Sequence, residues 1–173
     1  MKKLYLIGGT MGIGKTTVCQ WLKLKLNNSV FLDGDWCWDA NPFRVTEETK
    51  QMVMQNICFL LNQFIHCSVY DNIIFCWVMH EQSIIDNIKK NIDSAKCDIR
   101  SISLMCSPET LRTRLERDVA KGLRTADVVE RSIKRLPLYA ELDTQKLNTD
   151  DMSIDGIADM IIEICMGTGK YEQ

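Results

Sequence analysis

The fold of this chain is decided near its N-terminus by the stretch Gly9-Thr10-Met11-Gly12-Ile13-Gly14-Lys15-Thr16. The stretch matches the pattern G-x-x-x-x-G-K-[S/T], in which glycines let the backbone curl so that several N–H groups face inward. A short apolar run, residues 3–7, comes directly before it and predicts a buried strand. Directly after it, apolar residues recur every four positions and predict a helix, at Val18, Leu22 and Leu26.

A strand, a glycine loop and a helix in this order predict a Walker A loop, which binds nucleotide phosphates. Inward N–H groups and the positive end of the helix attract phosphate oxygens. Lys15 would reach the outer phosphates, and the Thr16 hydroxyl would ligate Mg²⁺. The predicted nucleotide-binding residues are Gly9, Gly12, Ile13, Gly14, Lys15, Thr16, Thr17 and, further along the chain, Arg114. The alternative is a plain glycine turn before a helix.

Beyond the loop, buried-type apolar segments alternate with amphipathic ones. Further strands are predicted over residues 30–32, 72–79, 99–106 and 145–149. Helices are predicted from Glu47, around Ile84, from Pro108, from about residue 125 and after Ser153. In the helix that Thr46 caps, the expected inward stripe is Val53, Ile57, Leu60 and Phe64. We therefore expect one α/β domain over residues 1–173, with helices on both faces of a parallel sheet and frayed residues at 167–173.

Composition excludes several classes of protein. The chain has 173 residues and a net charge of -2, and a chain of this length buries about 70% of its unfolded surface without needing disulfides. No apolar run reaches the ~20 residues of a membrane span, and the charge gives no drive toward nucleic acid. The eight cysteines contain no C-x-x-C pair and mostly lie among apolar residues. They predict reduced core thiols and a cytoplasmic location. The N-terminal apolar stretch is short and interrupted by glycines, so no signal peptide is expected.

Two carboxylates follow the second predicted strand, in the sequence Asp33-Gly34-Asp35. The carboxyl ends of parallel strands line one crevice, so we expect Asp33 and Asp35 to face the phosphate loop. The alternative is a simple Asp-Gly turn.

The residues that follow this pair are candidates for substrate binding. Trp36 and Arg44 combine a flat apolar surface with one charge, which would suit a ring-shaped or an anionic acceptor. His80 closes the third strand at the same edge. The alternative for the tryptophans is packing in the core.

Seven of the eight arginines lie between Arg100 and Arg135. Phosphoryl transfer needs cations over the migrating group, and the guanidinium fork matches phosphate oxygens. We therefore predict that Arg114, Arg117 and Arg124 close over the phosphates. The alternative is a solvated helix face whose arginines pair with acids such as Glu116, Asp118 and Glu130.

The loop, the aspartate pair and the segment from Ser107 to Arg117 together resemble the small P-loop phosphotransferases. This superfamily comprises the shikimate, gluconate and adenylylsulfate kinases and the adenylate-type nucleotide kinases. The resemblance implies the strand order 2-3-1-4-5, a substrate-binding region after the second strand and a mobile lid at about residues 117–127. It also implies that Asp33 holds magnesium, and that Asp35 orients the acceptor hydroxyl and accepts its proton. Lys15, Asp33, Asp35, Arg114 and Arg117 are the expected catalytic residues.

The sequence departs from individual members of that superfamily. Its third strand ends in Trp77-Val78-Met79-His80 instead of the glycine triplet of shikimate kinases, and the D-G-[FY]-[PR] turn of adenylate kinases is absent. The motifs N-K-x-D and D-x-x-G of GTPases are also absent.

The expected function is Mg²⁺-assisted transfer of the γ-phosphate of ATP to a hydroxyl or phosphate of a small molecule, by a monomer or homodimer. Two alternatives stay open, a nucleoside or nucleotide kinase and a nucleotide-dependent regulatory ATPase that has no small-molecule acceptor.

Overall fold

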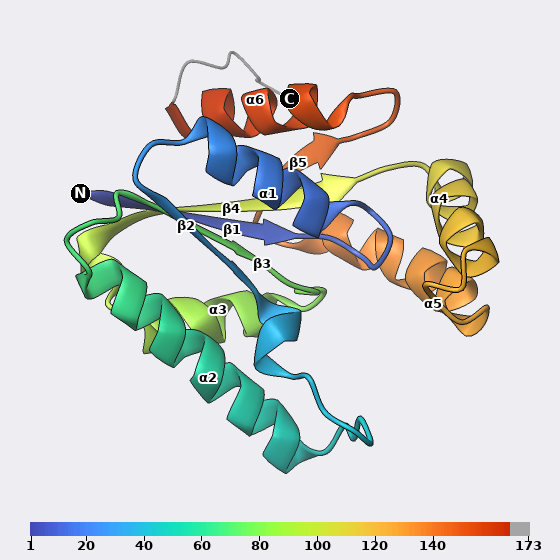
Figure 1. Cartoon of the computed structure of the whole chain (residues 1–173), viewed down its shortest axis with the longest axis horizontal. Helices are drawn as coiled ribbons and strands as arrows, with labels where there is room; N and C mark the ends of the chain where they lie inside the picture. The colour runs from blue at the N-terminus through green and yellow to red at the C-terminus, as the bar shows by residue number, and fades with distance from the viewer. Residues whose placement is uncertain (167–173) are drawn as a thin grey trace.

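Five parallel strands form one sheet in the order β2-β3-β1-β4-β5 in the computed structural model, which describes residues 1–166 (Figure 1). The predicted fold class and strand order are therefore confirmed. The predicted fraying at 167–173 lies outside the described residues. The strands are β1 (Lys2–Gly8), β2 (Ser29–Asp33), β3 (Asn72–Cys76), β4 (Cys97–Met105) and β5 (Gln145–Asn148).

Helices cover both faces of this sheet. The helices are α1 (Lys15–Lys25), α2 (Glu47–His66), α3 (Gln82–Asn91), α4 (Pro108–Ala120), α5 (Asp127–Arg135) and α6 (Ile154–Met166). Short 3₁₀ turns lie at η1 (Gly34–Cys37), η2 (Ser94–Lys96) and η3 (Leu136–Glu141). Figure 1 shows α1 and α6 on one face, α2 and α3 on the other, and α4 with α5 beyond the ends of the strands.

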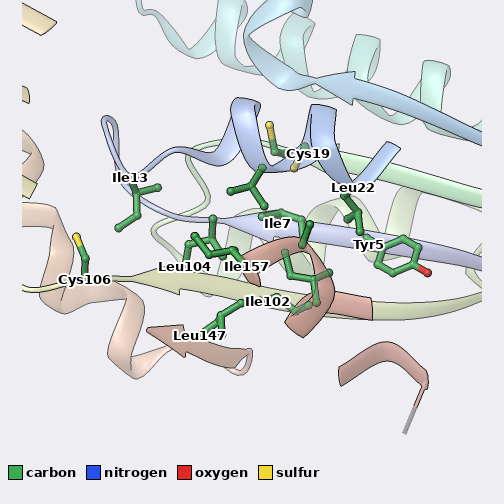
Figure 2. Packing of buried hydrophobic residues seen from close by; sticks show 14 of the residues in the cluster. Tyr5, Ile7, Ile13, Cys19, Leu22, Ile102, Leu104, Cys106, Leu147 and Ile157 are labelled. Atoms are coloured by element: carbon green, nitrogen blue, oxygen red, sulfur yellow. The ribbon is translucent and has the colours of Figure 1, made fainter. Parts of the chain in front are cut away.

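The core is divided by the sheet into two apolar clusters. On the α1 side, Ile7 and Ile102 of the central strands pack with Leu22 and Ile157 (Figure 2). On the other side, residues such as Phe75 and Leu61 join the sheet to α2 and α3. Burial on both faces explains the continuous apolar runs of the central strands, residues 4–7 of β1 and 73–76 of β3.

The third strand is shorter than the sequence predicts, since β3 ends at Cys76 and not at residue 79. Cys76 pairs with Ile7 of β1 and with Asp33 of β2. On one side β2 ends at Asp33, level with Cys76, and on the other the Trp77 N–H makes one last bond to the Ile7 carbonyl oxygen of β1, at 3.3 Å. The apolar run 77–79 predicts strand in the sequence, but these residues belong to no helix or strand.

The predicted inward stripe of α2 is partly wrong. Val53 and Ile57 are buried, but the stripe continues through Leu61 and Ile65, while Leu60 and Phe64 are half-buried. A helix turns 100° per residue, so a residue one position before a buried one lies near the edge of the buried face. Leu60 and Phe64 hold such positions before Leu61 and Ile65, and this explains why they are half-buried. The start of α2 is confirmed, since the Thr46 side chain accepts a hydrogen bond from the Thr49 N–H.

Among residues 1–166, no helix is both long enough and apolar enough to cross a bilayer.

Candidate active site

The loop between β1 and α1 follows a path that requires glycine. Gly12 has φ of 80°, a left-handed conformation that L side chains rarely adopt. A Cβ at Gly12 would also come within 2.3 Å of Leu115 Cδ2 in α4. The close approach of α4 therefore fixes the loop at the point where its backbone must curl.

Hydrogen bonds of two side chains hold the same loop against neighbouring elements. The fully buried Thr10 donates from Oγ1 to the carbonyl oxygen of Ser132 in α5, at 3.1 Å. Arg114 of α4 donates to the carbonyl oxygens of Ile13 and Thr149, each at 3.2 Å. Arg114, predicted to contact phosphate, thus joins the loop to the end of β5.

Lys15 lies at the start of α1 and turns back across the loop. Its Nζ donates to the carbonyl oxygens of Gly9 at 2.9 Å and Thr10 at 3.0 Å. Burial lowers the pKa of Lys15, and this effect is opposed by the negative charges of Asp35 and Asp33. The amine is therefore held at the loop by oxygens and by two nearby carboxylates. Of the other predicted loop residues, Ile13 is buried, whereas Gly14 and Thr17 are exposed.

The structure brings Thr16 and Asp33 together, although 17 positions separate them in the sequence. Thr16 Oγ1 donates to Asp33 Oδ2 at 2.6 Å, and Asp33 is only 4% exposed. A hydroxyl and a carboxylate at this distance present two hard oxygen donors, the kind that Mg²⁺ prefers. The donor set therefore fits the predicted magnesium site.

Asp35 is exposed two residues beyond Asp33, in the 3₁₀ turn η1. Its backbone N–H donates to Asp33 Oδ1 at 3.1 Å, and its own Oδ1 accepts from Trp77 Nε1 at 3.1 Å. Trp77 also lies against Gly34, where a Cβ would come within 2.5 Å of the indole ring. Only glycine at position 34 leaves room for the ring that holds Asp35.

The surroundings of Asp35 make it more basic than an ordinary aspartate. Desolvation by the surrounding protein and the negative charge of Asp33 raise the pKa of Asp35. Lys15 and the Trp77 hydrogen bond oppose that rise, as does Arg124 more weakly. A carboxylate with a raised pKa is a better proton acceptor, as a general base requires.

The predicted lid arginines occupy different environments. Arg124 lies in the connection between α4 and α5, where it pairs with Asp118 at 3.3 Å and contacts Met11 Sδ in the loop at 3.5 Å. Arg117 is exposed on α4. The alternative of ion pairs thus describes Arg124 with Asp118, and it also describes Arg112 with Glu130 and Arg131 with Asp127.

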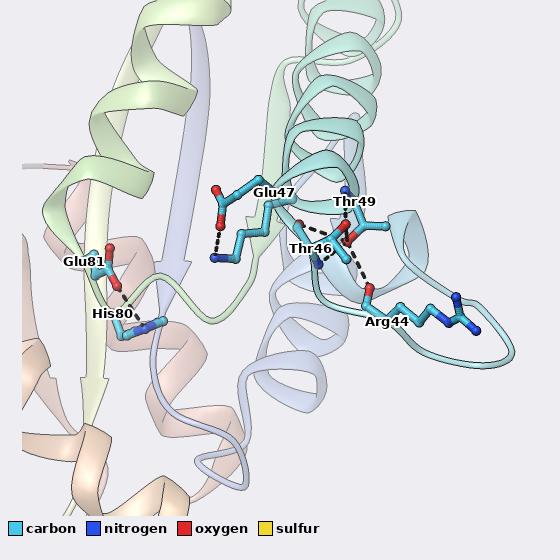
Figure 3. Close-up of polar contacts among 7 residues, drawn as sticks. Arg44, Thr46, Glu47, Thr49, His80 and Glu81 are labelled. Atoms are coloured by element: carbon cyan, nitrogen blue, oxygen red, sulfur yellow. Dashed lines mark hydrogen bonds and ion pairs between the residues drawn. The ribbon is translucent and has the colours of Figure 1, made fainter.

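Besides Asp35 and Arg124, three residues are predicted to bind substrate, and these three do not form one cluster. Trp36 lies next to Asp35, is 56% exposed and sets its ring edge-on against Phe31 at 5.2 Å. Figure 3 shows that Arg44 points away from His80, on the far side of the start of α2. His80 Nε2 lies 3.5 Å from Glu81 Oε1. Burial and the nearby Arg135 lower the pKa of His80, which favours the neutral imidazole.

Sequence reasoning missed three residues of this site, namely Thr10, Trp77 and Thr149. Trp77 could have been found from its position, because it follows the apolar residues of the third strand at the carboxyl edge of the sheet, where Asp33 and Asp35 are also expected. Thr10 and Thr149 carried no signal, because their partners Ser132 and Arg114 are remote in sequence.

Comparisons with known proteins agree with this geometry. The family model described as AAA domain matches residues 6–133. The tunicamycin resistance protein of Deinococcus radiodurans has a similar structure, with a TM-score of 0.72, 16% identity and 98% coverage of both chains. No curated protein sequence matches this chain.

Two further structures come from enzymes whose substrates are named. Shikimate kinase from Acinetobacter baumannii, in complex with shikimate, gives a TM-score of 0.63 at 18% identity, covering 99% of this chain and 96% of its own. The APS kinase of Mycobacterium tuberculosis, in complex with AMPPNP and APS, gives 0.64 at 14% identity, covering 95% and 98%. At these identities the likeness shows a shared fold.

Proposed function

This chain belongs to the AAA domain family, and from that premise we propose that it is a kinase that transfers the γ-phosphate of ATP to a small-molecule acceptor with the help of Mg²⁺. The observation that carries the proposal is the 2.6 Å hydrogen bond between Thr16 and Asp33. It joins the phosphate loop to the end of β2, and Asp35 follows immediately as a candidate base. A glycine turn without function would need no carboxylate pair at this position.

In this proposal the chain acts by holding and orienting the reactants. The loop amides and Lys15 hold the phosphates of the donor. Thr16 and Asp33 hold magnesium, which when bound would neutralise charge on the phosphate oxygens. The connection that carries Arg124, within the proposed lid at about residues 117–127, closes over the donor.

Asp35 has the role of general base. It orients the acceptor hydroxyl and takes its proton, while the acceptor oxygen forms a bond to the γ-phosphorus and the bond from that phosphorus to ADP breaks. Basicity supports this role, since desolvation and Asp33 raise the pKa of Asp35. The exposure of Asp35 leaves it open to an acceptor.

The free thiols support a proposed cytoplasmic setting. All eight cysteines are free, and six of them are buried. Unpaired cysteines packed as small apolar side chains suit a reducing compartment.

The experiment is an ADP-release screen over small alcohols, sugar acids, nucleosides and nucleoside monophosphates, with Mg²⁺ present. We expect one acceptor class to stimulate release, and we expect Lys15→Ala to abolish transfer while the fold stays intact by circular dichroism. Lys23→Ala, eight residues along the same helix, is the matched control and should transfer normally. Turnover that is indifferent to every acceptor would instead favour a regulatory ATPase.

A further inference from the structure

The strand β4 has one edge that is only half covered. β1 pairs with β4 over residues 97–103, whereas β5 pairs only with residues 102–105 near the arrowhead (Figure 1). Residues 97–101, which we call the open edge, therefore have no neighbouring strand on the β5 side within residues 1–166. A shallow groove of about 260 Å³ lies along the open edge, lined in part by residues 99–102 and 143–145. An unpaired strand edge of this kind is a template for pairing with another chain.

The backbone groups that the open edge presents follow from the alternation along a strand. The Met105 carbonyl oxygen accepts from the Thr149 N–H at 2.8 Å, so Met105 faces the β5 side. Alternate residues of a strand direct their N–H and carbonyl groups to the same side, so Cys97, Ile99 and Ser101 also face it. The Cys97 N–H already donates to a carbonyl oxygen of the turn η2. The groups that an incoming strand can use therefore include the Cys97 carbonyl, both groups of Ile99 and the Ser101 N–H.

An antiparallel pairing of two copies about Ile99 would match these groups to one another. Ile99 would stand opposite Ile99 of the second copy, and the two residues would exchange both of their backbone hydrogen bonds. Cys97 would stand opposite Ser101, whose N–H would donate to the Cys97 carbonyl oxygen. The open edge is therefore complementary to itself, as the interface of a two-fold dimer requires.

The charged side chains of the open edge favour the same register. Asp98 and Arg100 lie on one face of β4 and form an ion pair within the chain, with 3.0 Å between Asp98 Oδ2 and Arg100 Nη2. In the pairing about Ile99, each Asp98 stands opposite Arg100 of the second copy, where an antiparallel pair brings side chains closest. A pairing centred on Asp98 or on Arg100 would instead place like charges opposite each other, which is destabilising.

We propose that the open edge of β4 joins two copies of this chain in an antiparallel pair centred on Ile99, so that their two sheets become one continuous sheet. The open edge belongs to the amino-terminal half of β4, whereas the candidate active site lies at the carboxyl ends of the strands. Pairing therefore leaves both active sites open, and the dimer does not depend on the proposed function.

Charge reversals on the open edge test this proposal. Analytical ultracentrifugation of the full chain should show a monomer–dimer equilibrium with a Kd of about 10–100 µM, as for a small interface. Asp98→Arg and Arg100→Asp each place like charges opposite each other across the pair, and each should weaken the dimer about tenfold. An equimolar mixture of the two variants should associate as the wild type does, because one copy then carries two basic residues and the other two acidic ones at these positions.

Two further variants separate the edge from charge in general. Lys50→Glu on α2 reverses an exposed charge away from β4 and should leave the dimer Kd unchanged. Ile99→Pro removes an N–H that faces the open edge and spares the ladder with β1, so it should abolish the dimer while circular dichroism still shows the fold.

Hydrogen exchange at the Ile99 and Ser101 amides should slow as the protein concentration rises. A monomer at every concentration, or charge reversals that leave the Kd unchanged, would overturn the proposal. Slow exchange of these amides in a monomer would overturn it as well, because the chain's own residues would then cover the open edge.

Discussion

Trp77 Nε1 donates a hydrogen bond of 3.1 Å to Asp35 Oδ1, across 42 positions of sequence. The bond forms because β3 ends at Cys76 and the next side chain, the Trp77 indole, lies over Gly34. The bond holds Oδ1 of the exposed Asp35 carboxylate against the indole.

Trp77→Phe keeps the ring against Gly34 and removes the N–H. The hydrogen bond lowers the pKa of Asp35, so its loss should raise that pKa further. We expect the acid limb of the pH profile of kcat/KM to move to higher pH and kcat to fall about tenfold, with the KM for ATP unchanged. Trp21→Phe is a matched control, because Trp21 Nε1 donates to Asp155 away from the loop. If the acid limb does not move in Trp77→Phe, Trp77 does not position Asp35 as a base.

Asp35→Asn should make the protein more stable and less active. Because the pKa of Asp35 is raised in the folded state, folding disfavours its ionised form, and stability is lost as pH rises through that folded pKa. The neutral amide avoids this loss. We expect a higher Tm than wild type at pH 7, a difference that vanishes near pH 4, and a loss of transfer of about 10²- to 10⁴-fold.

Asp93→Asn is the opposite case and serves as the control. Hydrogen bonds from His66 and then Lys96 lower the pKa of Asp93, so its ionised form adds stability above its unfolded pKa. The variant should be less stable than wild type at pH 7, with a difference that shrinks as pH falls. If both variants shift Tm in the same direction at pH 7, the electrostatic account of Asp35 fails.

Thr16→Val keeps the shape of the side chain and removes the hydroxyl that bonds Asp33. If Thr16 and Asp33 share a magnesium ion, activity should need a higher Mg²⁺ concentration and fall about 10²-fold at fixed Mg²⁺. Binding of ATP in the presence of EDTA should change much less. Thr113→Val on α4, whose hydroxyl donates to the Glu109 carbonyl, should leave the Mg²⁺ dependence as it is. An unaltered Mg²⁺ requirement in Thr16→Val would contradict the assignment.

Gly12→Ala should destabilise the fold as well as the loop. Its φ of 80° strains an L residue, and the new Cβ would overlap Leu115. We expect a loss of about 2–4 kcal/mol in the free energy of unfolding, from strain and overpacking together. Gly122→Ala shares a positive φ of 70° but meets no atom within 4 Å, so its cost should be about 1 kcal/mol. Urea unfolding of both variants measures the difference.

Local patterns were sufficient to predict much of the fold. The Thr46 cap, the Ser107-Pro108 start of α4 and the apolar runs of the strands lie within a few residues of the structures they form. The end of β3 was predicted too late, because it depends on where the neighbouring strand β2 stops. The buried stripe of α2 was misplaced by one position, because apolar residues stand next to one another at 60–61 and 64–65 and the sequence alone does not select the buried member of each pair.

For the candidate site, the sequence by itself determined which chemistry is present. The loop Gly9 to Thr16 and the pair Asp33 and Asp35 are recognisable from spacing, since a tight glycine turn and a strand end are local events. Tertiary structure alone decided how these groups are held. Trp77 reaches Asp35, Arg114 ties Ile13 to Thr149, and Ser132 accepts from Thr10, because the parallel sheet brings distant strand ends to one edge and no local rule specifies such contacts.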